Sequence, residues 1–94
     1  MKEELTIKGE KILKRRRGWI IENEEIDLLI ETEKYVYVIE VKLQPKHSHI
    51  GELLSKVDLV KKYFPEKDVK PILIGSLIGK EIVSYAVSKG VEVY

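Results

Sequence analysis

Hydrophobic and polar positions are spaced differently in the two halves of the chain, and the first half has the spacing of strands. Ile, Val, Leu and aromatic residues are concentrated in residues 19–21, 26–32 and 35–43, with the short polar sequences ENEE and TEK between them. Such residues favour extended structure, and short connections favour antiparallel neighbours. We therefore predict an antiparallel meander of three strands.

The second half has the spacing of two helices and two strands. In residues 48–64 the apolar positions recur at intervals of three and four, as on one face of a helix, and Ser48 is its expected N-cap. The run PILIGS, at 71–76, is apolar in the manner of a strand covered by helices on both faces. Residues 79–89 predict a second helix, and the closing VEVY predicts a short strand.

One domain accounts for all of these elements. The chain has 94 residues and neither an internal repeat nor a linker-like stretch, so we expect a single domain over residues 1–94. Residues 3–15 have one thin apolar stripe of helical spacing, which Thr6, Ile7 and Gly9 weaken. The predicted order is (α)βββαβαβ, an α/β sandwich around a central mixed sheet.

Composition excludes several classes of protein. The chain is 44% hydrophobic and 35% charged, and no apolar run approaches the roughly 20 residues that span a bilayer. It has no cysteine, which excludes disulfides and thiolate zinc sites. The charged N-terminal sequence MKEELTIKGEK lacks the apolar core of a secretion signal, so we expect a cytoplasmic protein with no membrane partner. Asn23 and Gln44 are the only side-chain amides, and their scarcity beside abundant Lys and Glu is typical of thermophiles.

Charge is strongly segregated, although the net charge is only +1. Residues 1–20 carry seven bases and three acids, residues 21–33 carry six acids and no base, and residues 34–94 carry ten bases and seven acids. An acidic region between basic flanks suits a metal centre approached by a phosphate backbone. It equally suits a solvated hairpin, and the charge pattern alone favours that simpler interpretation.

Three charged residues interrupt the two most apolar predicted strands. Asp27 lies near the start of one strand, and Glu40 and Lys42 share one face of the next because side chains alternate along a strand. A hairpin that turns at Glu33 places Asp27 beside residue 39 or 40. Charges are avoided in buried strands unless they are paired, bind metal or take part in chemistry.

Two carboxylates and an amine at one end of a hairpin meet the needs of metal-assisted hydrolysis. Asp27 and Glu40 supply the hard oxygen ligands that Mg²⁺ prefers, and the backbone carbonyl of Val41 adds a neutral one. A bound ion makes its water more acidic. Lys42 can orient or deprotonate that water, or stabilise charge on phosphoryl oxygens. The alternative is an internal salt bridge in which Lys42 only offsets the two acids, and for an isolated E-x-K this alternative is the commoner one.

The sequences EIDLLI and YVIEVKL, followed by an amphipathic helix and the strand PILIGS, resemble the PD-(D/E)xK nuclease superfamily. This superfamily includes restriction endonucleases and archaeal Holliday junction resolvases, and the closing SYAVSKGVEVY is similar to small archaeal restriction-endonuclease-like domains. The resemblance covers residues 18–94 and implies a restriction-endonuclease-like fold that hydrolyses DNA with Mg²⁺ or Mn²⁺, often as a homodimer. It assigns the motif positions to Asp27, Glu40 and Lys42, with Ile26 where the family name has proline.

The first helix of this superfamily usually carries a glutamate that helps to hold metal. Here the corresponding region is short and poorly periodic, and Glu10 is the best candidate for that role. An ordinary surface glutamate is the alternative. A reduced first helix would leave that side of the domain for a dimer partner to cover, or would cost the domain its activity.

Polar residues also follow the predicted third strand. Gln44 shares the face of Lys42 and either reaches a phosphate or a metal-bound water or has no role there. Substrate would pass three residues at the exit of this strand, which are phosphate contacts or plain loop residues: Lys46, His47 and His49.

Basic residues elsewhere in the sequence are further candidates for contact with DNA. The four consecutive bases are candidate contacts to the DNA backbone: Lys14, Arg15, Arg16 and Arg17. A solvated charge run is the alternative. Lys56 lies beside the polar face of the first long helix, pointing either to solvent or to the metal end.

Three hypotheses follow from these observations. The first is a metal-dependent endonuclease acting on DNA, with a structure-specific substrate such as a branched junction as one form of it. The second is a non-catalytic DNA-binding or assembly module on the same fold, with the three charged residues kept for stability. The third is a homo-oligomeric interaction protein unrelated to nucleic acid. The first predicts metal-dependent cleavage, and the second predicts DNA retention without cleavage. The third predicts no salt-sensitive binding of DNA.

Overall fold

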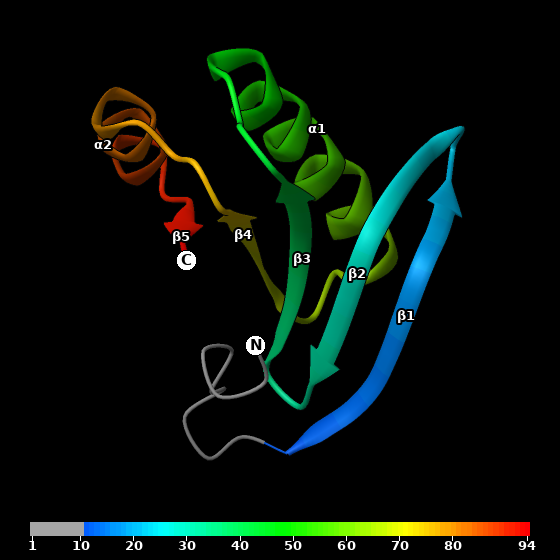
Figure 1. Ribbon diagram of the computed structural model, residues 1–94. Helices are drawn as coiled ribbons and strands as arrows, with labels where there is room; N and C mark the ends of the chain where they lie inside the picture. The colour runs from blue at the N-terminus through cyan, green and yellow to red at the C-terminus, as the bar shows by residue number, and fades with distance from the viewer. Residues whose placement is uncertain (1–10) are drawn as a thin grey trace.

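The structure is a computed structural model that describes residues 11–94 (Figure 1). Its elements follow the order βββαβαβ, which confirms the predicted succession for this part of the chain. The strands are β1 (Ile12–Ile21), β2 (Glu24–Thr32), β3 (Tyr35–Lys42), β4 (Asp68–Gly75) and β5 (Glu92–Val93), and the helices are α1 (His47–Tyr63) and α2 (Lys80–Ser88). Neither helix within residues 11–94 has the length and apolar composition to cross a bilayer.

The described strands form one mixed sheet in the order β1-β2-β3-β4-β5. β1, β2 and β3 are antiparallel, whereas β4 pairs parallel with β3 and β5 parallel with β4. Each parallel pair is joined through a helix because parallel strands require a crossover connection. The structure therefore confirms both the three-strand meander and the mixed sheet.

Both described helices pack on the same face of the sheet. One hydrophobic cluster joins Val38 of β3 to Leu53 of α1 and Ala86 of α2. The alternate side chains of the sheet, among them Ile39 and Ile72, form a second cluster on the opposite face. The apolar PILIGS run predicts helices on both faces of the sheet, and this prediction is wrong for the described helices, which cover one face only. The reason is that both crossovers run the same way along the sheet, and right-handed crossovers then place both helices on one side.

β1 is longer than the sequence predicts. It begins at Ile12 and not at Trp19, so the consecutive bases 14–17 lie within a strand and residues 12–15 are not helical. Among the described strands β1 is at the edge of the sheet and pairs only with β2, and most of its side chains are exposed, so it has no clear hydrophobic period. The rest of the region that has a thin helical stripe, residues 1–10, lies outside the described residues.

A two-residue turn joins β1 to β2 and sets their register. Glu22 and Asn23 have φ values of 49° and 71°. Positive φ at both central positions is typical of the type I′ turn, whose twist matches that of the flanking strands. Ile21 and Glu24 are paired directly beside this turn.

Candidate active site

Asp27 and Glu40 lie at the same end of the β2–β3 hairpin and are connected by hydrogen bonds across it. Regular pairing of the strands ends at Leu28 and Ile39, and the next step brings Asp27 opposite Glu40. The Asp27 N–H donates to Glu40 Oε2 at 3.3 Å, and the Val41 N–H donates to Asp27 Oδ2 at 3.0 Å. Each carboxylate therefore accepts a hydrogen bond from the neighbouring strand. The structure brings the two acids together as their spacing predicts.

The backbone of β1 has an unusual conformation at the level of Asp27, although the register with β2 is unbroken there. Gly18 of β1 lies between two regular pairs and has a φ of +58°. A Cβ at this position would lie 3.1 Å from Glu25 Oε2. Glycine adopts positive φ at little cost, whereas a residue with a side chain would be strained there. Gly18 is thus required in the strand that supports Asp27.

Glu40 is buried beneath α1, with 4% of the residue exposed, and its partner is Lys56. Lys56 Nζ lies 3.1 Å from Glu40 Oε1, while Oε2 accepts the Asp27 N–H, so both carboxylate oxygens have donors. A carboxylate removed from water requires such partners. The sequence leaves Lys56 pointing either to solvent or to the metal end, and the structure places it at the metal end. Its signal is the three-residue spacing from Leu53, which places it beside the helical face that packs on the sheet.

Lys42 lies at the end of β3, two residues beyond Glu40, and its side chain is partly buried. Among residues 11–94 its ammonium makes no hydrogen bond and no ion pair. The salt bridge considered from the sequence therefore uses Lys56 in place of Lys42. The Lys42 backbone is closely packed, because a Cβ on Gly75 would lie 2.8 Å from its carbonyl oxygen. Gln44, two residues further along the chain, is exposed.

The two acids fit a hard divalent ion as part of its ligand shell. Asp27 Oδ1 accepts no hydrogen bond from residues 11–94, and carboxylate oxygens are the ligands that Mg²⁺ and Mn²⁺ favour. Within the described residues no three carboxylate or imidazole side chains converge. An ion here would complete its shell with water, a backbone carbonyl or phosphate oxygens, as Mg²⁺ commonly does. The candidate third acid, Glu10, lies outside the described residues.

The polar residues after β3 belong to the start of α1. Lys46, and not Ser48, is the N-cap, and its N–H donates to His49 Nδ1 at 2.9 Å. A polar side chain at the third helical position satisfies the N-cap amide in this way. The His47 ring meets the Tyr85 ring edge to face, with centroids 4.9 Å apart. Both imidazoles therefore have structural partners, and Lys46 keeps an exposed side chain.

The basic run lies on β1 with its side chains alternating between the two faces. By register, Arg16 is on the helix-covered face, and Arg15 and Arg17 are on the opposite one. The Arg16 guanidinium carbon lies 5.2 Å from the centre of the Trp19 ring, and its buried Nε has no acceptor among the described residues. Arg15, Arg17 and Lys14 are exposed. The four cations thus do not form one continuous surface.

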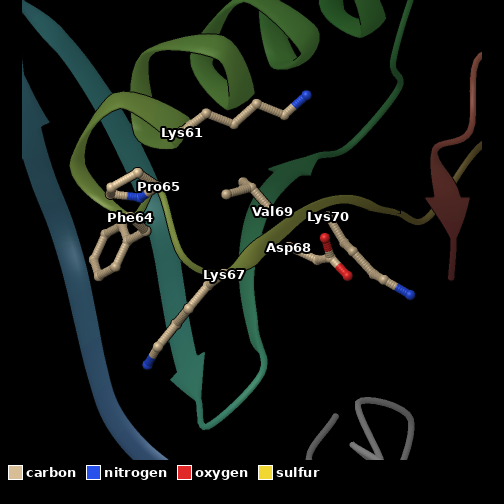
Figure 2. A pocket seen from close by; sticks show the side chains of 7 residues that line it. All are labelled: Lys61, Phe64, Pro65, Lys67, Asp68, Val69 and Lys70. Carbon is tan, nitrogen blue, oxygen red and sulfur yellow. The ribbon is translucent and has the colours of Figure 1, made fainter.

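A pocket of about 380 Å³ lies at the other end of the parallel strands (Figure 2). Three lysines are among its lining residues, but Figure 2 shows their amino groups pointing in different directions. Lys67 Nζ is held by Glu31 at 2.6 Å and by the Thr32 carbonyl at 2.7 Å, and Lys70 lies over the Tyr35 ring at 4.3 Å. Lys67 and Lys70 are thus used within the fold and the three amino groups do not converge, so we assign no anion site to this pocket.

Comparison with solved structures gives the same architecture. The chain superimposes on a repair endonuclease from Pyrococcus abyssi with a TM-score of 0.72 and 18% identity over 90% of its length. It superimposes on the EndoMS-dsDNA2 complex with a TM-score of 0.70 and 21% identity over 93%. For the protein of unknown function AF1548 the values are 0.69 and 18% over 85%. No family model and no curated protein matches the chain.

These similarities show that the chain has the restriction-endonuclease-like fold, which confirms the predicted fold class and the structural side of the resemblance. The chain spans only 37%, 36% and 47% of the lengths of these three structures, in the same order. The chain therefore corresponds to less than half of each matched protein.

Proposed function

We propose that the protein is an endonuclease that hydrolyses phosphodiester bonds of DNA with the help of Mg²⁺ or Mn²⁺. The observation that carries this proposal is the connection of Asp27 to Glu40 across neighbouring strands, with the unpaired ammonium of Lys42 two residues away. The shared fold of a repair endonuclease and of EndoMS bound to double-stranded DNA supports it.

In this proposal Asp27 and Glu40 hold the ion, and the Val41 carbonyl adds a neutral oxygen. The bound ion makes a water more acidic and offsets charge on the phosphate. Lys42 acts on the substrate side, because no described acid neutralises its ammonium. It donates hydrogen bonds to the phosphoryl oxygens on which negative charge grows, or it orients the attacking water.

DNA would be held by exposed cations, whose contacts with phosphates give salt-dependent affinity. Among the predicted DNA contacts, the exposed lysines and arginines are Lys14, Arg15, Arg17 and Lys46. We further propose a homodimer, since Val41 and Leu43 are 47% and 68% exposed beside the carboxylates and offer an apolar surface to a second copy.

Cleavage of labelled junction, flap, single-stranded and duplex DNA in Mg²⁺, Mn²⁺ or EDTA tests this function. We expect cleavage that requires metal and falls by about 100-fold or more in Lys42→Met, because a group that stabilises the transition state is lost. Lys62→Met removes an exposed lysine of α1 and is the matched control, with activity unchanged. Wild-type protein that cleaves none of these DNAs in either metal would contradict the proposal.

A second function has one observation in its favour. Glu40 already has a buried counter-ion in Lys56, as expected where charges are kept for stability in a non-catalytic DNA-binding module. That module would retain DNA in a gel-shift assay without cutting it, with or without Mn²⁺. The two functions therefore differ in the fate of the DNA and not in its binding.

A further inference from the structure

We infer that Lys56 is a displaceable counter-ion, which competes with a divalent cation for Glu40 and leaves the carboxylate when the metal binds. This inference rests on the metal-binding role proposed above. It adds that a residue of α1, which has no part in the proposed reaction, lowers the affinity of the site for metal.

The first argument concerns the hydrogen-bond donors that the two carboxylate oxygens of Glu40 already have. Oε2 accepts the Asp27 N–H at 3.3 Å, and Oε1 accepts Lys56 Nζ at 3.1 Å. The backbone bond to Oε2 belongs to the strand pair, so the ligand that can move is the lysine. A metal that coordinates Glu40 through Oε1 would compete with the ammonium for that oxygen.

The second argument is electrostatic. The side chains of Lys56 and Glu40 are only 12% and 5% exposed, so water screens little of the field between them. An ammonium and a divalent ion on one buried carboxylate repel each other strongly. Without metal, the charges of Asp27, Glu40, Lys42 and Lys56 balance. With metal, the site gains two positive charges, and the departure of Lys56 relieves part of that excess.

The third argument is that Lys56 has another position to occupy. Its four-carbon stem is flexible, so the ammonium can turn away from the sheet while the helix stays in place. Glu52 lies four residues earlier on α1 and is exposed. Glutamate and lysine at this spacing and in this order attract one another along a helix. Glu52 is therefore a ready partner for the displaced ammonium.

Titration of Mn²⁺ into the DNA-free protein, followed by calorimetry and by thermal melting, tests the inference. Lys56→Met removes the competing cation, so we expect Mn²⁺ to bind at least about tenfold more tightly than to wild-type protein and to raise the melting temperature more. Lys62→Met removes one lysine of the same helix without touching a carboxylate and should bind as wild type does. Adding Asp27→Asn to Lys56→Met should abolish the gain, which locates the ion.

The unpaired carboxylate in Lys56→Met destabilises the metal-free fold, so a second variant is needed. Lys56→Gln can still donate a hydrogen bond to Glu40 but carries no charge, and it should show the same gain in affinity. Equal or weaker Mn²⁺ binding by both variants would overturn the inference while leaving the proposed function intact. Absence of Mn²⁺ binding by wild type and variants alike would overturn both.

Discussion

The backbone N–H of Asp27 donates to Glu40 Oε2, so a main-chain group of β2 positions a side chain of β3. Asp27→Asn keeps the shape of the residue and an oxygen that can accept the Val41 N–H, but removes the charge. We expect the fold to persist, with a change in the free energy of unfolding below about 1 kcal/mol. The rise in melting temperature that Mn²⁺ gives to wild-type protein should disappear, because the ligand charge is lost.

Asp27→Ala is the companion variant for this prediction. It removes the acceptor of the Val41 N–H as well as the charge, and should cost about 1 kcal/mol more in urea unfolding than Asp27→Asn. A Mn²⁺-induced shift of wild-type size in Asp27→Asn would place the ion elsewhere.

The Lys56–Glu40 ion pair predicts strongly non-additive mutations. In EDTA, Glu40→Leu leaves a buried lysine without its partner, and we expect it to lower the free energy of unfolding by about 3 kcal/mol. Lys56→Met should cost a similar amount. The double variant leaves no unpaired charge, so it should be much more stable than the sum of the single changes predicts. A double-mutant cycle in urea measures this coupling, and simple additivity would mean that the pair contributes nothing.

Two glycines should respond in opposite ways to the same substitution. At Gly75, a Cβ would lie 2.8 Å from the Lys42 carbonyl oxygen and 2.8 Å from Ile78 Cγ1, so Gly75→Ala should destabilise the protein by about 1–3 kcal/mol. It should also lower any cleavage rate, since the end of β3 must shift. At Gly51, on an exposed part of α1, no atom lies within 4 Å of the added Cβ.

Gly51→Ala is thus the matched control and should stabilise the protein by up to about 1 kcal/mol through the higher helix propensity of alanine. Thermal melting and urea unfolding of both variants check the pair. Equal effects of the two substitutions would show that the contact with Lys42 is not the cause.

The alternation of the basic run predicts different roles for neighbouring arginines. Arg17 is exposed, and Arg17→Gln should leave stability unchanged while reducing the slope of log K against log salt by about 0.9 for one lost phosphate contact. Arg16 lies over Trp19, and Arg16→Gln should cost about 1 kcal/mol of stability. Fluorescence anisotropy with duplex DNA at several salt concentrations, beside urea unfolding, measures both quantities. A stability loss in Arg17→Gln larger than in Arg16→Gln would reverse the assignment.

The meeting of Asp27 with Glu40 can be predicted from the sequence because register in this hairpin is strongly constrained. The connection between β2 and β3 is short, and a slip of one residue would turn Leu29 and Val38 away from the helices. Two acids fixed by such a register can be placed before any coordinates are known. Their catalytic role is a separate matter, which the proposed assays address.

The length of β1 and the place of Lys56 are harder to predict, each for a physical reason. Four consecutive bases have no period of two, so residues 14–17 give no strand signal although backbone pairing with β2 extends through them. Lys56 carries its charge on a long apolar stem, so a place beside the polar face of α1 fits both solvent and the metal end, and the sequence pattern does not decide between them. In the same way, the apolar PILIGS run indicates that the strand is buried, but it does not indicate which face of the strand a helix covers.

The outer edge of β1 has a consequence for solutions of the protein. This strand is ten residues long, is the last strand of the sheet that residues 11–94 form, and carries Lys14, Arg15 and Arg17 on exposed positions. An unpaired edge is a template for an identical edge, and two copies aligned there would bring like charges together at a strand spacing of about 4.8 Å. Their repulsion acts as a barrier to this pairing, so concentrated salt, which screens it, should be the condition in which two copies first associate edge to edge.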